Sequence, residues 1–238
     1  MRNLSRMTAP HWLGLYAALV AAWGGIWMIS APVKVSWATL IADLCRATPV
    51  DAGGMGLVAM WLLMSAAMML PTALPAFATY DDIADAHGTG GGGALVAGYG
   101  LVWVAFALVA ATVQVALVRT AHLDAPWLAP LLLAGAGAYQ FSPMKDACLS
   151  KCRQPLTFFM GHWADGPLRM GVRLGAVCLG CCWALMALGL IGGAMSIAFM
   201  ALATLLMTLE KLSQGTVLPR AIGLACFAGA GFLIGGLI

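Results

Sequence analysis

The stretch LVWVAFALVAATVQVALV, residues 101–118, decides the fold of this chain, because it runs for eighteen residues without a charged side chain. A helix needs about 20 apolar residues to cross the hydrocarbon core of a bilayer. Similar apolar blocks recur along the chain, which is 62% hydrophobic and only 9% charged, with a mean hydropathy of +0.93. Transmembrane β-strands would instead alternate in hydrophobicity. The sequence therefore predicts an all-α, polytopic transmembrane helix bundle embedded in the lipid bilayer.

The apolar blocks predict seven helices within a single integral membrane domain, residues 1–238. The fourth and sixth blocks are short, so six helices is the alternative count. We expect an acidic, glycine-rich loop at residues 80–93 and a cysteine-containing loop at residues 142–167, between the fourth and fifth helices. The seven expected helices are Trp12 to Ala31, Met55 to Phe77, Ala94 to Val118, Trp127 to Phe141, Leu168 to Ile191, Ala194 to Leu209 and Val217 to Leu237.

Positive charge is distributed unequally between the two ends of these helices. In the seven-helix arrangement Lys34, Arg46 and Arg119 lie on one side of the membrane and the other nine of the twelve Lys and Arg residues lie opposite. Cytoplasmic loops carry an excess of Lys and Arg. We therefore expect a cytoplasmic N-terminus, an extracytoplasmic C-terminus and a cytoplasmic loop 142–167. The net charge of +3 reflects these loop anchors and does not indicate nucleic-acid binding.

The segment CLGCCW, residues 178–183, places three thiols on one face of the fifth predicted helix. Cys178, Cys181 and Cys182 are neighbours there because residues three and four apart lie side by side on a helix. Met186 continues the same stripe. Soft sulfur ligands suit Cu(I), with Zn(II) as the second choice. Small buried cysteines are the alternative explanation, but three thiols at these spacings favour a metal site.

A second pair of thiols, Cys148 and Cys152, lies in the most charged stretch of the chain. In a helix their Cβ atoms would be about 5 to 6 Å apart, whereas a relaxed disulfide needs about 3.8 Å. The spacing favours metal binding over a disulfide, and the neighbouring Lys145, Lys151 and Arg153 are expected to favour the thiolate forms. Two buried thiols near the membrane interface is the alternative.

Other candidate features carry less chemistry. Met60, Met64 and Met68 form a column of thioethers at i, i+4 steps, a spacing that suits Cu(I) but also ordinary helix packing. Gly171 and Gly175 form a small-xxx-small pattern that allows a neighbouring helix to approach closely. The chain has no His-x-x-x-His pair, Gly-x-Ser-x-Gly motif or nucleotide fingerprint. We therefore expect a binding protein more than an enzyme.

The motifs resemble those of the DUF2182 family, the predicted metal-binding integral membrane proteins. The resemblance covers most of the chain from Met55 onward and implies a bacterial inner-membrane protein with a metal site. After the sixth helix begins, the chain has Met195-Ser196-Ile197-Ala198-Phe199-Met200 where the family often has Met-Asn-Leu-x-Trp-Met. The matching pieces are Trp61 with Ala67-Met68-Met69-Leu70-Pro71, Tyr139 to Lys145, Cys148-x-x-x-Cys152-Arg153-x-Pro155, Gly171-x-x-x-Gly175, Cys178-x-x-Cys181-Cys182-Trp183-x-x-Met186 and Glu210-Lys211.

These observations lead to a copper hypothesis with two alternatives. The chain is expected to bind Cu(I) in the membrane as a transporter, chaperone or metallation factor. A membrane thiol-disulfide oxidoreductase is one alternative, and a non-catalytic accessory subunit of a larger membrane enzyme complex is the other. The expected metal ligands are Cys148, Cys152, Cys178, Cys181, Cys182 and Met186.

The charge distribution yields a labelling prediction. Single cysteines introduced into a Cys-depleted background by Arg2→Cys, Gly90→Cys or Asp146→Cys should all resist an impermeant thiol reagent in intact cells, because all three positions are expected to face the cytoplasm. Labelling at 146 with protection at 2 would show that the number of helices between them is wrong by one.

Overall fold

The computed structural model describes residues 10–30, 53–120, 127–190 and 197–236, and these residues fold into helices joined by short turns. A helix is present at each of the seven predicted positions, and three predicted boundaries, Ala31, Ile191 and Ala194, lie outside the described residues, as does the end at Leu237. The α-helices are α2 (Pro10–Ser30), α4 (Gly53–Ala86), α5 (Gly92–Thr120), α6 (Leu128–Gln140), α7 (Pro143–Arg153), α8 (Pro155–His162), α9 (Pro167–Ala187), α10 (Ile197–Leu212) and α11 (Val217–Gly235).

The predicted loop at residues 80–93 is largely helical. α4 does not stop near Phe77 but continues through Pro71 and Pro75 to Ala86, so it includes the acidic residues at its end. Proline removes a backbone donor, yet membrane helices tolerate it where neighbouring groups compensate. The turn proper is short and uses positive φ at Gly88 (64°) and Gly91 (121°), a conformation that glycine adopts without a steric cost.

The predicted loop at residues 142–167 is also wrong, because it folds into α7, α8 and a short 3-10 helix, Trp163–Asp165. The local sequence explains α7: Ser142 caps the helix by accepting a hydrogen bond from the Lys145 amide at 3.2 Å, and Pro143 occupies the first turn. Pro155 opens α8 in the same way. The low hydropathy that indicated a loop instead marks a polar, amphipathic helix.

Among the described residues, four helices are long and apolar enough to cross a membrane: Gly54–Ala86, Gly92–Leu117, Pro167–Ala187 and Val217–Gly235. α6 and α10 have 13 and 16 residues, and α2 contributes only the shorter apolar segment Trp12–Ile26. A helix that spans the hydrocarbon core needs about 20. The expectation of seven membrane-crossing helices is therefore met only in part.

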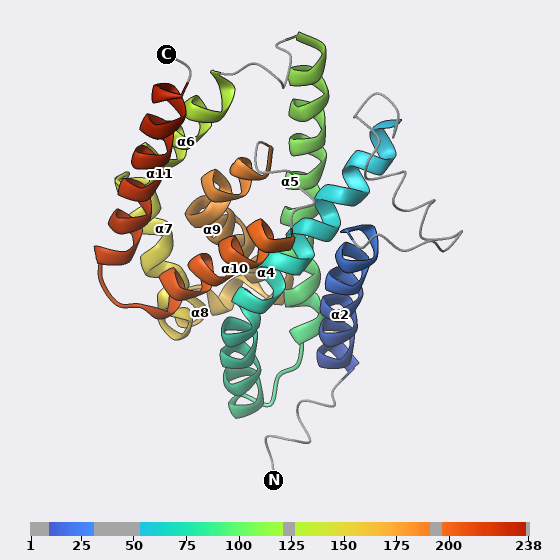
Figure 1. The fold of residues 1–238 in the computed structure, drawn as a ribbon. Helices are drawn as coiled ribbons and strands as arrows, with labels where there is room; N and C mark the ends of the chain where they lie inside the picture. The colour runs from blue at the N-terminus through green and yellow to red at the C-terminus, as the bar shows by residue number, and fades with distance from the viewer. Residues whose placement is uncertain (1–9, 31–52, 121–126, 191–196, 237–238) are drawn as a thin grey trace.

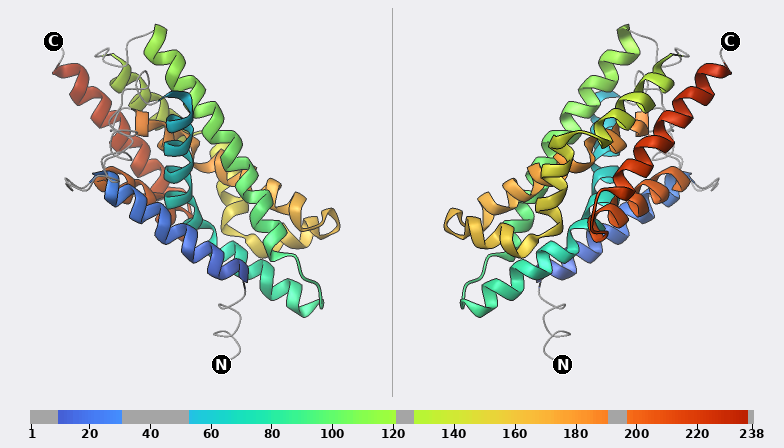
Figure 2. Two further views of the ribbon diagram at one scale, coloured as in Figure 1. Left: turned by 90° about the vertical axis from the view of Figure 1, so that its right-hand side faces the viewer. Right: turned by 90° about the vertical axis from the view of Figure 1, so that its left-hand side faces the viewer.

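The bundle has two distinguishable ends. Figure 1 shows the α4–α5 turn, α8 and the α10–α11 turn on the lower side, whereas α5 and α11 end on the upper side. The side views in Figure 2 show the end of α4, the beginning of α5, α8 and the beginning of α9 gathered at the lower end. Aromatic contacts hold this end together, since the ring of Tyr80 lies 5.5 Å from those of Phe159 and Trp163.

The closest helix contact joins α5 and α9, and it depends on glycine. A Cβ at Gly171 would overlap the carbonyl oxygen of Leu95, and one at Gly98 would overlap that of Leu168. At Gly175 an added Cβ would lie 2.9 Å from the Val102 side chain. The small-xxx-small pattern of α9 thus packs against α5, as the sequence predicts.

This contact predicts that Gly171→Ala destabilises the bundle by about 1–3 kcal/mol, because the two backbones must separate to admit the methyl group. Thermal or detergent-induced unfolding of the purified protein measures the effect. Gly100→Ala is the matched control on α5, where an added Cβ meets nothing within 4 Å. Equal stability of the two variants would contradict the proposed contact.

Candidate metal centre

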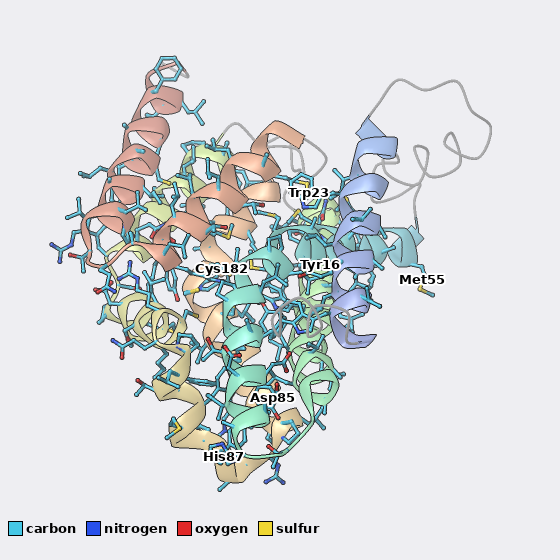
Figure 3. The ribbon with its side chains drawn as sticks, turned by 90° about the horizontal axis from the view of Figure 1, so that it is seen from below. Tyr16, Trp23, Met55, Asp85, His87 and Cys182 are labelled. Carbon is cyan, nitrogen blue, oxygen red and sulfur yellow. The ribbon has the colours of Figure 1, made fainter. Side chains whose placement is uncertain are left out.

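The three thiols of α9 lie together inside the bundle. Cys178, Cys181 and Cys182, called the α9 thiols from here on, are each 2% exposed. Their sulfur atoms all lie within 4.8 Å of one another. The carbonyl oxygen of Cys178 accepts hydrogen bonds of 3.0 Å from the thiols of both Cys181 and Cys182. Figure 3 shows Cys182 in the middle of the bundle, far from Met55 at its edge. The helical spacing therefore produces the predicted cluster.

Two neighbouring helices add groups to the α9 thiols. From α4, the thioether sulfur of Met69 lies 3.5 Å from the thiol of Cys182. From α5, the Tyr99 hydroxyl lies 3.2 Å from the sulfur of Cys178. The glycine contact between α5 and α9 brings Tyr99 to this position, since Tyr99 lies one residue after Gly98. The cluster is thus completed by side chains remote in sequence.

A lysine contributes the positive charge nearest to the cluster. The Nζ atom of Lys211, at the end of α10, lies 3.1 Å from the sulfur of Cys178 and donates a 2.6 Å hydrogen bond to the hydroxyl of Thr72. An ammonium group at this distance stabilises a thiolate. The preceding residue, Glu210, points to a different face of α10, because adjacent residues on a helix do not face the same way. Glu210 is buried against α7.

The α7 thiols, Cys148 and Cys152, extend the cluster outward. Cys152 lies with its sulfur 3.9 Å from that of Cys181. Cys148 lies over Gly180, where an added Cβ would come within 2.6 Å of its sulfur. Both α7 thiols are partly exposed, unlike the α9 thiols. Cys148 and Cys152 lie one helical turn apart on α7, and the thiol that Cys152 contacts belongs to α9.

The electrostatic environment of the α7 thiols differs from the prediction. Burial raises the pKa of the Cys148 thiol, and Cys181 adds to this effect while Lys151 opposes it. Hydrogen bonding to Cys178 and then to Cys181 raises the pKa of the Cys152 thiol well above its ordinary value. The basic residues therefore do not favour the thiolate forms as expected, because Lys145 and Arg153 contact Glu210 instead.

A buried ion pair between Lys145 and Glu210 joins α7 to α10. Lys145 donates to both carboxylate oxygens of Glu210 at 2.9 Å, and the two side chains are only 1% and 2% exposed. Arg153 donates to the backbone carbonyl of Glu210 through Nε at 3.0 Å and Nη2 at 2.8 Å. α7 is thereby fastened to α10 at both ends, with its thiols directed at α9.

The methionines singled out in the sequence lie in the core, and a further methionine lies beside the α9 thiols. Met60, Met64 and Met68 are buried, and so is Met186. The thioether beside the cluster is Met69. It is the residue following Met68, rotated by about 100° on the helix, and no local spacing distinguished it. Only its place in the Ala67 to Pro71 motif drew attention to it.

The donor set fits a soft metal ion. Sulfur atoms bound to one ion through bonds of about 2.3 Å lie about 3.8 to 4.6 Å apart, depending on the angle at the metal. The 3.9 Å between the sulfurs of Cys152 and Cys181 lies in this range, and the sulfurs of the α9 thiols are within 4.8 Å of one another. Thiols and a thioether suit Cu(I), whereas hard cations require oxygen ligands.

Comparison with known proteins places this site within a family. The family model described as PpoB2, copper chaperone, matches residues 58–233, about three quarters of the chain. The matched region contains the α9 thiols, the α7 thiols, Met69, Tyr99 and Lys211. The comparisons with curated proteins and with solved structures found no match.

The buried ion pair predicts a large stability difference between two lysine or arginine substitutions. Lys145→Met should destabilise the protein by about 3–5 kcal/mol, because it leaves the Glu210 carboxylate buried without its counter-charge. The control is Arg173→Met, which removes the solvent-exposed pair with Asp165, 3.2 Å, and should cost at most about 1 kcal/mol. Unfolding in detergent compares them. The double variant Lys145→Met/Glu210→Met should recover stability. A double variant as unstable as Lys145→Met would show that the unpaired Glu210 charge is not the cause of the loss.

Proposed function

We propose a copper-carrying function, because the chain belongs to the PpoB2 copper chaperone family and holds three thiols together inside the bundle. In this proposal the α9 thiols bind one Cu(I) ion, which is the cargo of the protein. The single observation that carries it is the convergence of these sulfurs within 4.8 Å at 2% exposure. Burial protects Cu(I) from water and from oxidants, and leaves exchange with another sulfur ligand as the route of release.

The ligands beyond the α9 thiols have different proposed roles. Met69 supplies a thioether that binds Cu(I) without losing a proton. Lys211 offsets the negative charge that builds up when thiolates gather, since its Nζ lies 3.1 Å from Cys178. The Tyr99 hydroxyl lies 3.2 Å from the same sulfur and would donate a hydrogen bond to its thiolate form. Met186, one turn after Cys182 and fully buried, stays a proposed ligand.

Zn(II) is the competing metal. Structural zinc sites are closed and four-coordinate, and Cys152 beside Cys181 would supply a fourth thiol. Cu(I) is favoured because Met69 places a thioether, a soft donor, 3.5 Å from the sulfur of Cys182. The family is also one of copper chaperones.

We further propose that the protein works in the bacterial inner membrane with its N-terminus in the cytoplasm. α9, which carries the α9 thiols, is one of the helices long and apolar enough to span a membrane. Basic side chains occur on α7, near the start of α9 and at the α10–α11 turn, and Figure 1 shows α8 and the α10–α11 turn on the lower side of the bundle. Arg2, Arg6, Lys34 and Arg46 lie outside the described residues. The recipient of copper would be another membrane protein or enzyme complex.

A copper titration tests the function. Protein purified anaerobically in detergent and titrated against a coloured Cu(I) chelator should retain one tightly bound ion. The triple variant Cys178→Ser/Cys181→Ser/Cys182→Ser should bind at least about 100-fold more weakly, because hydroxyls are poor ligands for Cu(I). X-ray absorption of the loaded protein should show sulfur ligands.

The control is Cys226→Ser, which removes a buried thiol of α11 and should leave the affinity unchanged. Equal copper affinity in the triple variant and in this control would exclude the α9 thiols as ligands. Tighter binding of Zn(II) than of Cu(I) would replace the proposed metal. Recovery of the protein with a disulfide between Cys152 and Cys181, and no affinity for copper, would favour the oxidoreductase.

A further inference from the structure

The sulfur atoms of this protein follow a gradient from the surface of the bundle to its core. Cys148 and Cys152 on α7 are partly exposed. Cys152 contacts Cys181, and Cys181 belongs to the α9 thiols, which are 2% exposed. Beyond them lies Met69, which is fully buried on α4. A metal ion bound to the innermost sulfurs therefore has a series of sulfur ligands between itself and the outside.

The spacing along this series permits exchange without a large movement. The 3.9 Å between the sulfurs of Cys152 and Cys181 is within the separation expected when two sulfurs bind the same ion, about 3.8 to 4.6 Å. Cys148 approaches the same part of α9 because Gly180 has no side chain, and the hydroxyl of Tyr139 donates to the carbonyl of Gly180. The sulfurs of Cys152 and Cys181 are thus close enough to bind one ion, and Cys148 lies next to them over Gly180.

Contacts with Glu210 hold both ends of α7 against α10. The buried pair of Lys145 with Glu210 fixes its first turn, and the contacts of Arg153 with the Glu210 carbonyl fix its last turn. The α7 thiols lie between these anchors, one turn apart. Among the described residues, α7 is not one of the four helices long and apolar enough to span a membrane. Its thiols therefore lie on a short helix of 11 residues.

From this geometry we propose that Cys148, Cys152 and Cys181 form an outer site that receives Cu(I) before the α9 thiols do. The inference rests on the proposed function, because it assigns the order in which copper meets the sulfurs. Cys181 is common to both sites and carries the ion inward. At each step the incoming thiol forms a bond to copper and releases its proton to water, after which one bond to an outer sulfur breaks and that sulfur regains a proton. Copper stays in the Cu(I) state throughout.

The outer site makes a kinetic prediction that a static ligand set does not. Stopped-flow mixing of the protein with a coloured Cu(I)–chelator complex measures the loading rate, and titration measures the final affinity. Cys148→Ser and Cys152→Ser should each slow loading at least about 10-fold, while the affinity of the α9 thiols changes by less than about 3-fold. Cys226→Ser is the control and should load at the wild-type rate.

A direct test isolates the outer site from the inner one. The variant Cys178→Ser/Cys182→Ser keeps Cys148, Cys152 and Cys181, and should bind one Cu(I) more weakly and exchange it faster than wild type. Adding Cys152→Ser should abolish that binding. Circular dichroism of each variant confirms that it is folded.

The outcomes separate the inference from the proposed function. Absence of copper binding in wild type overturns the proposed function itself. Tight wild-type binding with unchanged loading rates in Cys148→Ser and Cys152→Ser overturns the outer site alone. A lowered affinity at an unchanged loading rate would make the α7 thiols permanent ligands of one site, and no binding by Cys178→Ser/Cys182→Ser would also reject a separate outer site.

Discussion

The close contact between α5 and α9 determines the arrangement of the whole candidate centre. Helices in a bilayer gain little from burying apolar surface against one another, so they associate through close packing of small residues. Here Gly98 and Gly171 let the two backbones touch, and any larger side chain would separate them. That contact sets the position of Tyr99 against Cys178 and directs the thiols of α9 toward α4, where Met69 meets them. The position of the sulfur atoms thus depends on the backbone contact between α5 and α9.

The second constraint is electrostatic. A buried ion pair costs desolvation free energy and is weak evidence for stability by itself. The pair of Lys145 and Glu210 is nevertheless specific, because a misplaced α7 would leave two charges buried without partners. The ion pair therefore selects one position of α7 among many that apolar packing would allow. The neighbouring Lys211 faces the thiols while Glu210 faces α7, so two consecutive residues of α10 serve the centre and its support separately.

Hydropathy predicted the places of seven helices, because apolar blocks long enough to enter a membrane are separated by polar segments. It failed where polar residues are themselves helical, at the end of α4 and in α7, and it missed α8 because that helix has only 8 residues. The α9 thiols could be predicted because their spacing is local to one helix. Met69, Tyr99 and Lys211 could not, because they lie 113, 79 and 33 residues from the cysteines that they contact. Only the fold brings such distant residues together.

The location of the α9 thiols on a single helix affects how copper and folding are linked. A ligand set that forms as soon as one helix forms is available before the bundle has assembled. Metal bound by these thiols alone would therefore have a similar affinity for the assembled and the unassembled chain. A ligand stabilises the native state only by its preference for that state. Coupling between metal and assembly must therefore come from a sulfur on another helix, and Met69 on α4 is placed to supply it. Under the proposed function, Cu(I) could bind the α9 thiols before the bundle assembles and would stabilise the assembled bundle only through Met69.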